Sequence, residues 1–345
     1  MKKIPHLDTP LPSVSIIIPC FNEENYILNC VHSCLHQIYY GELVVIVVDG
    51  NSTDSSVALI EKLEQQFSHK LILLHNHQRT TPISLNLGLK HKEAQFKMIL
   101  GAHSTLPPDY IQKCVQAFEN HPEASCVGGI ILNQYANATS ESIGLAMSSP
   151  FGVGNATFRT GGEKKWVDTV AFGMYKHEVF EKIGWFNEDL IRNQDDEFNF
   201  RVTKAGFRIL FDPSIHCDYF VRGSYRKLWK QYFQYGFWKV YVNILHHQVT
   251  SIRQLFPAAF VLYLLIWMTT LSISMGIFQI SSIPAMMYLL AGLFFALRKK
   301  KSKWLYIALS FPILHLSYGL GYWKGIIQLG IFKIQPHAHH AQHNR

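Results

Sequence analysis

The sequence lacks ionisable side chains over a long stretch in its C-terminal third. Residues 254–297 contain no Asp, Glu, Lys, Arg or His. A run of this length accommodates two membrane-spanning helices of about 20 residues each. A further apolar stretch, residues 304–321, is interrupted by His315. We therefore expect about three membrane helices within residues 254–334, of which the last either crosses the bilayer or lies in its interface.

A secretory signal is also missing from the N-terminal end. Residues 1–13 contain three prolines and lead into an apolar segment of only five residues, 14–18, which does not resemble the core of a signal peptide. The basic cluster at residues 298–303 lies between the second and third apolar segments, and the positive-inside rule places it on the cytosolic side. We expect a multi-pass protein of the cytoplasmic (inner) membrane with its N-terminal domain in the cytosol.

Cysteine pairs with the spacing of a zinc site are absent as well. Reduced, mostly buried thiols are the expectation for a cytosolic domain. The net charge of +8 gathers just before and between the apolar segments, which suits an anionic membrane surface better than nucleic acid. The six cysteines are Cys20, Cys30, Cys34, Cys114, Cys126 and Cys217.

The N-terminal half alternates short apolar runs with helical patterns. The predicted strands are residues 14–18, 43–48, 71–74 and 97–100, and helices are predicted at residues 24–37 and 54–66. This alternation predicts an α/β fold with a mostly parallel sheet. Ligands of such sheets bind beyond the carboxyl ends of the strands, so the residues after each strand are the candidates for a site.

Polar residues follow the first two predicted strands. Asn22 and Glu23 follow the first strand without a Gly-x-Gly-x-x-Gly pattern, which argues against a dinucleotide-binding enzyme. Asp49 follows the second strand. It is either a turn residue or an acceptor for a base N–H or sugar hydroxyls.

Polar residues also follow the third and fourth predicted strands. Arg79 comes after the third strand and is either a solvated surface residue or a contact for a diphosphate. His103 comes after the fourth strand. An imidazole at a strand end can bind a metal, although a single His supplies only one of the ligands that a metal site needs.

A helix expected after Asn193 begins with three consecutive carboxylates. Asn193 is expected to cap it, and Asp195, Asp196 and Glu197 fall in its first turn, where the helix dipole favours negative charge. Glu197 and Arg201 are four residues apart and are expected to form an ion pair. A capped helix explains this pattern by itself. The polar segments expected at one sheet edge favour a functional role.

Residues 224–246 interleave aromatic and basic side chains. Such a mixture can bind single-stranded nucleic acid. Directly before apolar segments, however, it is typical of amphipathic helices at the level of the lipid headgroups. We favour interfacial helices over residues 224–253 and expect no nucleic-acid partner.

Three motifs taken together resemble the family 2 glycosyltransferases. They are residues 14–24, 47–54 and 194–201, and the resemblance covers residues 13–239. Within that family the chain looks most like the membrane-attached transferases of succinoglycan and related exopolysaccharide assembly. The segments that carry this closer likeness are residues 152–155, 168–170 and 235–239.

The resemblance implies a domain order and site residues. A GT-A nucleotide-sugar-binding domain would span residues 1–223, followed by the interfacial helices, the transmembrane region and a His-rich tail at 335–345. Asp195 would be the catalytic base. Gln194, Asp196, Glu197 and Arg201 would contact the acceptor or support Asp195. The implied donor-binding residues are Pro19, Phe21, Asn22, Glu23, Asp49, Asn51, Arg79, Asn86 and His103.

A divalent cation, Mg or Mn, is a further implication of the resemblance. His103 stands at the second acidic position of the family's Asp-x-Asp motif and would be the metal ligand, while Gly101 replaces the first Asp. A cation requirement is therefore in doubt.

The implied activity is inverting transfer from a nucleotide-diphosphate-sugar, expected to be a UDP-sugar, to a lipid-linked acceptor in cell-surface polysaccharide biosynthesis. Two alternatives stay open. One is direct transfer to a polyprenyl phosphate, and the other is a membrane scaffold that lost its chemistry through Gly101.

Overall fold

The computed structural model describes residues 10–221 and 223–334, and the predicted His-rich tail lies outside the described residues. The described chain forms two compact units. One comprises residues 10–132 and 161–219, and the other comprises residues 133–160 and the C-terminal helices from residue 220. Each unit is described by itself.

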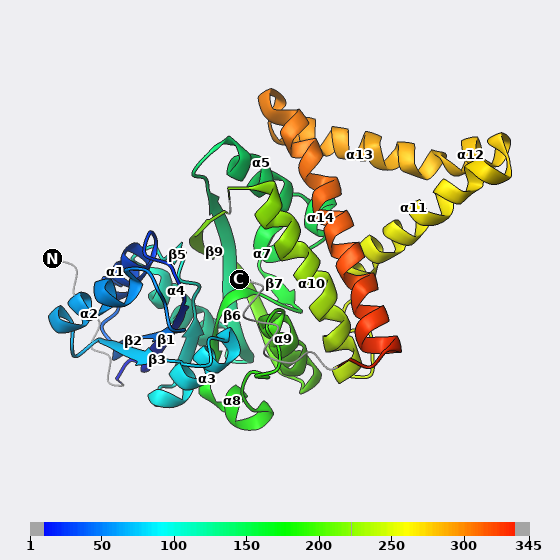
Figure 1. Ribbon diagram of the computed structural model, residues 1–345. Helices are drawn as coiled ribbons and strands as arrows, with labels where there is room; N and C mark the ends of the chain where they lie inside the picture. Colours follow the sequence, from blue (N-terminus) through cyan, green and yellow to red (C-terminus); the bar gives the residue numbers. More distant parts are fainter. Residues whose placement is uncertain (1–9, 222, 335–345) are drawn as a thin grey trace. The chain divides into compact units, whose positions relative to one another are not determined.

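The first unit is built on a nine-stranded sheet with the order β3-β2-β1-β4-β8-β6-β9-β5, in which β7 pairs with β9 (Figure 1). Its strands are β1 (Val14–Cys20), β2 (Leu43–Asp49), β3 (Leu71–His75), β4 (Phe96–Ile99), β5 (Ser104–Thr105), β6 (Ala124–Gln134), β7 (Lys165–Val167), β8 (Ala171–Lys176) and β9 (Arg208–Phe220). Its helices are α1 (Ile27–Leu35), α2 (Ser56–Gln66), α3 (Thr81–His91), α4 (Tyr110–Asn120), α8 (His177–Ile183) and α9 (Gln194–Lys204).

The first four strands are parallel, as the alternating sequence pattern predicts. β1 and β2 are continuous β-branched runs buried on both faces, which is typical of central parallel strands. Their register pairs Cys20 with Asp49, so the two strands end side by side. The later strand pairs, such as β4 with β8, are antiparallel. The predicted GT-A type of α/β fold is confirmed, with the parallel part confined to the N-terminal half.

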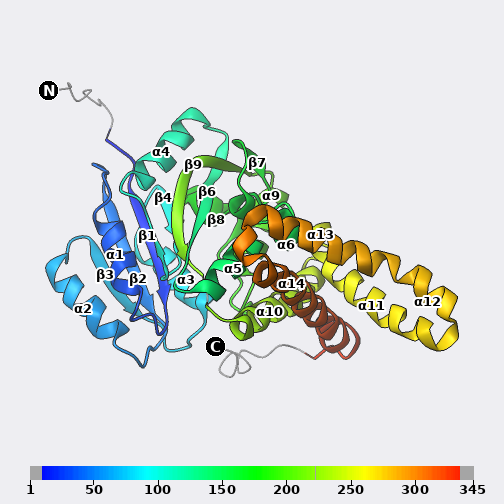
Figure 2. The ribbon, with the colours of Figure 1, turned by 90° about the horizontal axis from the view of Figure 1, so that it is seen from above.

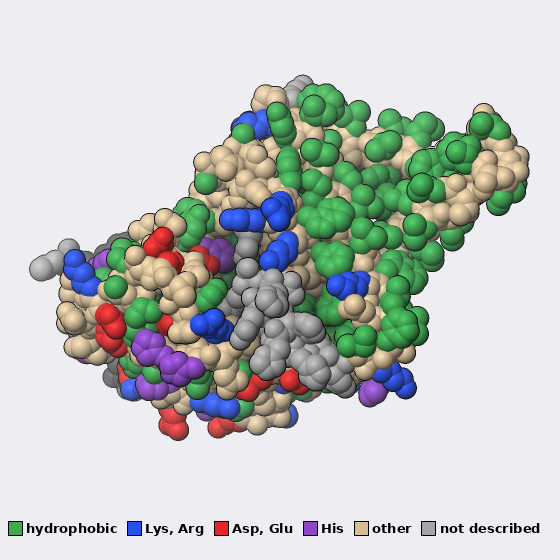
Figure 3. Space-filling view, in the orientation of Figure 1, with side chains coloured by type: hydrophobic (Ala, Val, Ile, Leu, Met, Phe, Trp, Pro, Cys, Tyr) green, Lys and Arg blue, Asp and Glu red, His purple; other side chains and the backbone are tan. Residues whose placement is uncertain are grey.

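The second unit consists of helices. They are α5 (Ala138–Met147), α6 (Pro150–Val153), α7 (Thr157–Thr160), α10 (Tyr225–Leu245), η1 (Ile252–Leu255), α11 (Phe256–Ile273), α12 (Met275–Ser281), α13 (Ile283–Lys299), η2 (Lys301–Lys303), α14 (Trp304–Gly325) and η3 (Ile326–Ile331). Three stretches are long and apolar enough to cross a membrane: Ile252–Ile273, Met275–Lys299 and Trp304–Ile331. Hydrophobic side chains cover the surface of these helices (Figure 3).

Residues 133–160 group with the C-terminal helices, although the predicted domain boundary lies at residue 223. Glu141 forms ion pairs with Lys300 and Lys303. The Phe151 ring stacks on Phe295 at 5.5 Å between centroids and meets the edge of Phe311 at 4.9 Å. Both kinds of contact join residues about 150 positions apart, which explains why local sequence patterns do not reveal them.

Candidate active site

The loops that follow β1 and β2 are tied together by hydrogen bonds. The Asn22 amide donates to Ser52 Oγ at 2.9 Å, and the Thr53 amide donates to Asn22 Oδ1 at 2.8 Å. The Glu23 amide donates to Ser56 Oγ at 2.9 Å. Asn22 adopts a left-handed conformation with φ 54°, which Asn tolerates better than most residues. The two predicted donor-binding loops therefore form one rigid edge.

Asp49 is buried at the end of β2, with 1% of its surface exposed. Its carboxylate accepts hydrogen bonds from the amides of Asn51 at 2.9 Å and Ser52 at 3.1 Å. His75 Nδ1 lies 4.0 Å from the same carboxylate. The turn role that the sequence left open is therefore present, and the carboxylate organises the loop from beneath.

The pKa of the Cys20 thiol reflects its burial and the negative charge at this edge. Burial, followed by the carboxylates of Asp49 and Glu23, raises the pKa of Cys20 to about 12. The thiol is protonated and inert at neutral pH. All six cysteines lie in the described part of the chain and are buried thiols without a disulfide, as predicted.

Arg79 and Asn51 meet across the ends of β2 and β3. With the Asn51 amide oriented to accept, Arg79 donates to its oxygen at 2.5 Å and 3.1 Å. Both residues have positive φ angles, 64° for Asn51 and 62° for Arg79. Strained backbone of this kind persists where the surroundings hold it in place. The guanidinium is therefore positioned at the strand-end edge.

His103 follows β4 and lies beside Glu23. His103 Nδ1 is 3.4 Å from Glu23 Oε1, and each side chain is about one quarter exposed. The imidazole ring meets the Tyr219 ring at 5.0 Å between centroids. The loops after β1 and β4 thus bring together two residues predicted from separate motifs.

Gly101 leaves no room for a side chain without movement of Phe172. A Cβ at Gly101 would lie 3.1 Å and 3.2 Å from two carbons of the Phe172 ring, which is tighter than most Cβ contacts. Phe172 has φ 52°, an uncommon conformation for an aromatic residue. A side chain at position 101 would therefore crowd the Phe172 ring.

This geometry also bears on whether side chains at this edge can bind a divalent cation. Within residues 10–221 and 223–334, no group of three or more His, Cys, Asp and Glu side chains is arranged to hold a metal. His103 and Glu23 are two donor side chains that lie together at this edge. The protein groups at this edge therefore do not form a complete cation site.

α9 presents the acidic helix start. Asn193 occupies the N-cap position in the left-handed conformation, with φ 61°, and the helix amides receive no side-chain cap from it. The predicted N-cap position is therefore confirmed, although the side chain makes no capping hydrogen bond. Asp195 is exposed, Gln194 and Asp196 are half-buried, and the Asp196 amide donates to Asp195 Oδ1 at 2.9 Å.

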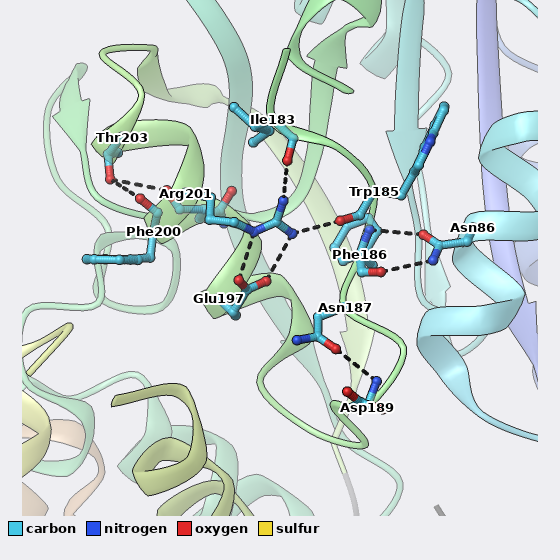
Figure 4. Close-up of polar contacts among 11 residues, drawn as sticks. Asn86, Ile183, Trp185, Phe186, Asn187, Asp189, Glu197, Phe200, Arg201 and Thr203 are labelled. Atoms are coloured by element: carbon cyan, nitrogen blue, oxygen red, sulfur yellow. Dashed lines mark hydrogen bonds and ion pairs between the residues drawn. The ribbon is translucent and has the colours of Figure 1, made fainter. Parts of the chain in front are cut away.

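The predicted ion pair on α9 is confirmed (Figure 4). Arg201 donates to both carboxylate oxygens of Glu197, from Nε at 2.7 Å and from Nη2 at 3.0 Å. It also donates to the carbonyl oxygens of Ile183 at 2.7 Å and Trp185 at 2.8 Å. Glu197 is 1% exposed. The pair therefore fastens α9 to the segment after α8.

Asn86 belongs to the same support (Figure 4). Its Nδ2 donates to the Phe186 carbonyl at 2.9 Å and to Glu188 Oε1 at 2.8 Å, and its Oδ1 accepts from the Phe186 amide at 3.0 Å. Asn86 is buried. These bonds occupy both ends of its amide group and join α3 to the loop before α9.

Asn199 places α9 at the strand-end edge, a role that sequence reasoning missed. Its Nδ2 donates to Thr169 Oγ1 at 2.9 Å, and its Oδ1 accepts from the Tyr175 hydroxyl at 2.8 Å. Thr169 lies just before β8, which runs antiparallel to β4, so it is at the edge where β4 ends. Asp195 is one turn before Asn199 on the same helix face. The sequence feature that pointed to this contact is the motif at residues 168–170, which contains Thr169.

The remaining predicted donor residues flank the end of β1. Pro19 is the penultimate residue of β1, Phe21 follows the strand directly, and both are half-buried. The structure thus brings the strand-end residues, the α9 start and their supports to one edge of one sheet.

This fold and this edge define a glycosyltransferase of the GT-A type. The model of glycosyl transferase family 2 matches residues 15–184. The dolichyl N-acetyl-alpha-D-glucosaminyl phosphate 3-beta-D-2,3-diacetamido-2,3-dideoxy-beta-D-glucuronosyltransferase of Methanococcus voltae is 31% identical over 334 residues, which cover 91% of this chain and 97% of that protein. The chain therefore belongs to glycosyl transferase family 2.

Two further comparisons agree with this assignment. The succinoglycan biosynthesis protein ExoA of Rhizobium meliloti (strain 1021) is 24% identical over 324 residues, covering 90% of this chain and 94% of that protein. A solved mannosyltransferase from Pyrobaculum calidifontis, in complex with GDP-Man and Mn2+, superposes with a TM-score of 0.63 at 19% identity, covering 90% of this chain and 88% of that one. The latter likeness concerns the fold.

Proposed function

We propose that this glycosyltransferase moves a sugar from a nucleotide-diphosphate-sugar, expected to be a UDP-sugar, to a lipid-linked acceptor with inversion at the anomeric carbon. The observation that carries the proposal is the hydrogen bond between Asn199 and Thr169. It anchors α9 so that the exposed Asp195 stands at the edge of the sheet where the donor loops lie.

Asp195 acts as the general base in this proposal. Its carboxylate takes the proton from the acceptor hydroxyl as the oxygen attacks the anomeric carbon. The bond to the diphosphate breaks on the opposite face, and the nucleoside diphosphate leaves with the electron pair. Arg79 and His103 are the groups placed to stabilise its charge, since each follows a strand at the donor edge.

The loops around Asn22, Asn51 and Asp49 shape the donor pocket. Asp49 holds the second loop by accepting two of its amides, and Pro19 and Phe21 flank the first loop. We assign Asn86 a positioning role, because its amide is bonded to the segment before α9. Glu197 and Arg201 position Asp195 in the same way, and Gln194 and Asp196 lie beside it on the acceptor side.

The names of the two relatives support a lipid-linked saccharide acceptor. The Methanococcus voltae enzyme is named for transfer to a dolichyl phosphate that already carries a sugar, and the Rhizobium meliloti protein is named for succinoglycan biosynthesis. The first name favours extension of a lipid-linked sugar over direct transfer to a polyprenyl phosphate. We place the activity at the cytosolic face of the cytoplasmic membrane, as the basic cluster at 298–303 indicates.

Replacing Asp195 tests the assignment of the base. Asp195→Asn keeps the size of the side chain and removes its basicity, so turnover should fall by roughly 10²-fold to 10⁴-fold. Donor binding, measured by calorimetry, should stay unchanged. Glu61→Gln, which changes an exposed carboxylate of α2 outside the site, is the control and should keep most of the activity. Full turnover by Asp195→Asn would disprove the assignment.

Acceptor and donor measurements separate the alternatives. Membranes containing the protein are supplied with polyprenyl phosphate and with polyprenyl-phosphate-linked sugar in parallel, and product should form with the second acceptor. Transfer to the bare lipid phosphate would support the alternative enzyme. Calorimetry with nucleotide-sugars, with and without manganese, tests the scaffold hypothesis, because a scaffold without chemistry should bind none of them.

A further inference from the structure

We propose that α14 lies along the membrane surface beside α10, so that only the hairpin formed by α11, α12 and α13 crosses the bilayer. By length and composition α14 is a third candidate span. The packing of the second unit, however, favours a position of α14 at the membrane surface. The proposal concerns the membrane anchor and does not depend on the proposed reaction.

α10 and α14 run parallel and in contact over their length (Figures 1 and 2). Near their starts, the Tyr225 hydroxyl donates to the Tyr306 carbonyl at 3.0 Å. Further along, a Cβ at Gly321 would lie 2.0 Å from the Phe233 carbonyl oxygen. At the end of α14, a Cβ at Gly325 would lie 2.9 Å from the carbonyl oxygen of Phe237, which is in the middle of α10. Since the two helices share one direction, both cross the membrane or neither does.

The contacts at the two ends of the hairpin, the start of α11 and the end of α13, indicate that α10 does not cross the membrane. At the start of α11, Arg253 Nη1 donates to Asn155 Oδ1 at 3.3 Å. At the end of α13, Lys299 Nζ donates to the Ser148 carbonyl at 2.7 Å, and Lys300 pairs with Glu141. All three partners lie in residues 133–160, which connect two strands of the α/β sheet. The start of α11 and the end of α13 therefore lie against the same segment, residues 133–160.

The chain also enters α10 beside this segment, four residues after β9 ends. The Val221 amide donates to the Gln134 carbonyl at 3.0 Å, which holds the entry to α10 next to β6. Because α10 starts beside Gln134, and Arg253 returns to Asn155 of the same segment soon after α10 ends, α10 stays at the level of residues 133–160. The parallel α14 stays with it.

Burial separates α14 from the hairpin. In its apolar window 44% of the residues are buried inside the protein, against 17% and 11% for the windows of α11 and α13. α11 and α13 diverge from α14 and meet at α12 (Figure 1), and the 18 residues of α11 span about 27 Å, close to the thickness of the hydrocarbon core. The hairpin has the exposure and the length of a lipid-embedded element.

An anionic bilayer surface is the partner that fits the α10–α14 pair. α10 exposes Arg226, Lys227 and Lys230 at its start, next to the exposed Trp229. α14 exposes an apolar face. Its exposed residues include Leu305, Tyr306, Leu309 and Leu320. Cations beside aromatic and apolar side chains are typical of helices that lie at the headgroup level.

Thiol labelling in sealed vesicles of one orientation tests the proposal. The six native cysteines are buried, so single cysteines are introduced as Lys333→Cys after α14, Ser274→Cys at the hairpin tip and Asn120→Cys in the catalytic domain. With a membrane-impermeant maleimide, Lys333→Cys should label from the same side as Asn120→Cys, and Ser274→Cys from the opposite side. Each thiol is shown to be reactive in detergent.

Two outcomes would overturn the proposal: labelling of Lys333→Cys from the side of Ser274→Cys, or its protection from both sides until detergent is added. The depth of spin labels in the bilayer gives an independent measurement. Spin labels at Leu305, Leu309 and Leu320 should report one common depth, whereas a spanning α14 would show depth changing steeply along the helix. Neither readout requires enzymatic activity, so a failure here is distinct from a failure of the proposed function.

Discussion

At the residue scale, Gly101 and Phe172 explain how this chain departs from the acidic motif of its family. The Phe172 ring lies 3.1 Å from the place that a Cβ at 101 would take. Glycine at this position is therefore matched to its neighbour, and restoring a carboxylate at 101 would require a smaller residue at 172 as well.

This coupling is testable by a double-mutant cycle. Gly101→Ala should cost about 1 kcal/mol, because the added methyl group must displace a packed ring. In a Phe172→Ala background the same substitution should cost nothing, since the ring is gone. The stabilities of the wild type, the two single variants and the double variant are compared by their apparent Tm, measured on the full chain in detergent. Equal costs in both backgrounds would show that the two sites are independent.

The raised pKa of Cys20 predicts its reactivity. A thiol with a pKa of about 12 is protonated below that pH, so its thiolate fraction at pH 8 is on the order of one in ten thousand. Iodoacetamide should leave Cys20 unmodified in the folded protein and modify it in denaturant, as measured by peptide mass spectrometry. Rapid modification of the folded protein at pH 8 would contradict this environment.

At the scale of elements, α9 depends on its buried ion pair for its position. Side chains fix α9 on two of its faces, Glu197 and Arg201 on one and Asn199 on another. Position matters here because a general base must stay within hydrogen-bond reach of the hydroxyl it deprotonates. Loss of either attachment should affect turnover more than donor binding.

Glu197→Gln tests the ion pair. It leaves the Arg201 guanidinium without its carboxylate in a mostly buried place, and the cost should be about 2 to 3 kcal/mol, below that of a fully buried pair because Arg201 is 20% exposed. The matched control is Asp109→Asn, which breaks the Lys113–Asp109 pair, also four residues apart but more exposed. It should cost less than about 0.5 kcal/mol. Similar Tm shifts for the two variants would contradict the assigned role.

At the scale of the whole molecule, the stability of the second unit depends on close approach of α10 and α14. Gly236 and Gly321 face carbonyl oxygens of the opposite helix, and a Cβ at either position would lie 2.0 Å from that oxygen. Backbone atoms cannot rotate away, so a larger residue must push the helices apart.

Gly321→Ala should therefore lower the stability of the unit by about 1 to 3 kcal/mol. Gly276→Ala is the matched control, because its Cβ would meet only Ser274 Oγ at 3.7 Å among the described residues. Apparent Tm in detergent and the rate of tryptic cleavage compare the two. Identical behaviour would show that the contact is dispensable.

The sequence by itself determined the class of fold and the places to look for a site. β-branched runs identified β1 and β2, and charge-free stretches identified helices that are long and apolar enough to span a membrane. Three local motifs predicted Asp195, Asp49 and the loop after β1 as site residues. These features depend on neighbouring residues, because burial and helix formation follow local periodicity.

Only the tertiary structure decided which distant residues meet. It showed Phe172 against Gly101, Asn86 bonded to Phe186, and Glu141 paired with Lys300. Such contacts depend on how strands and helices pack, which local periodicity does not contain. The role of α14 has the same origin: its composition suits a membrane span, and its full-length contact with α10 indicates that it lies at the surface.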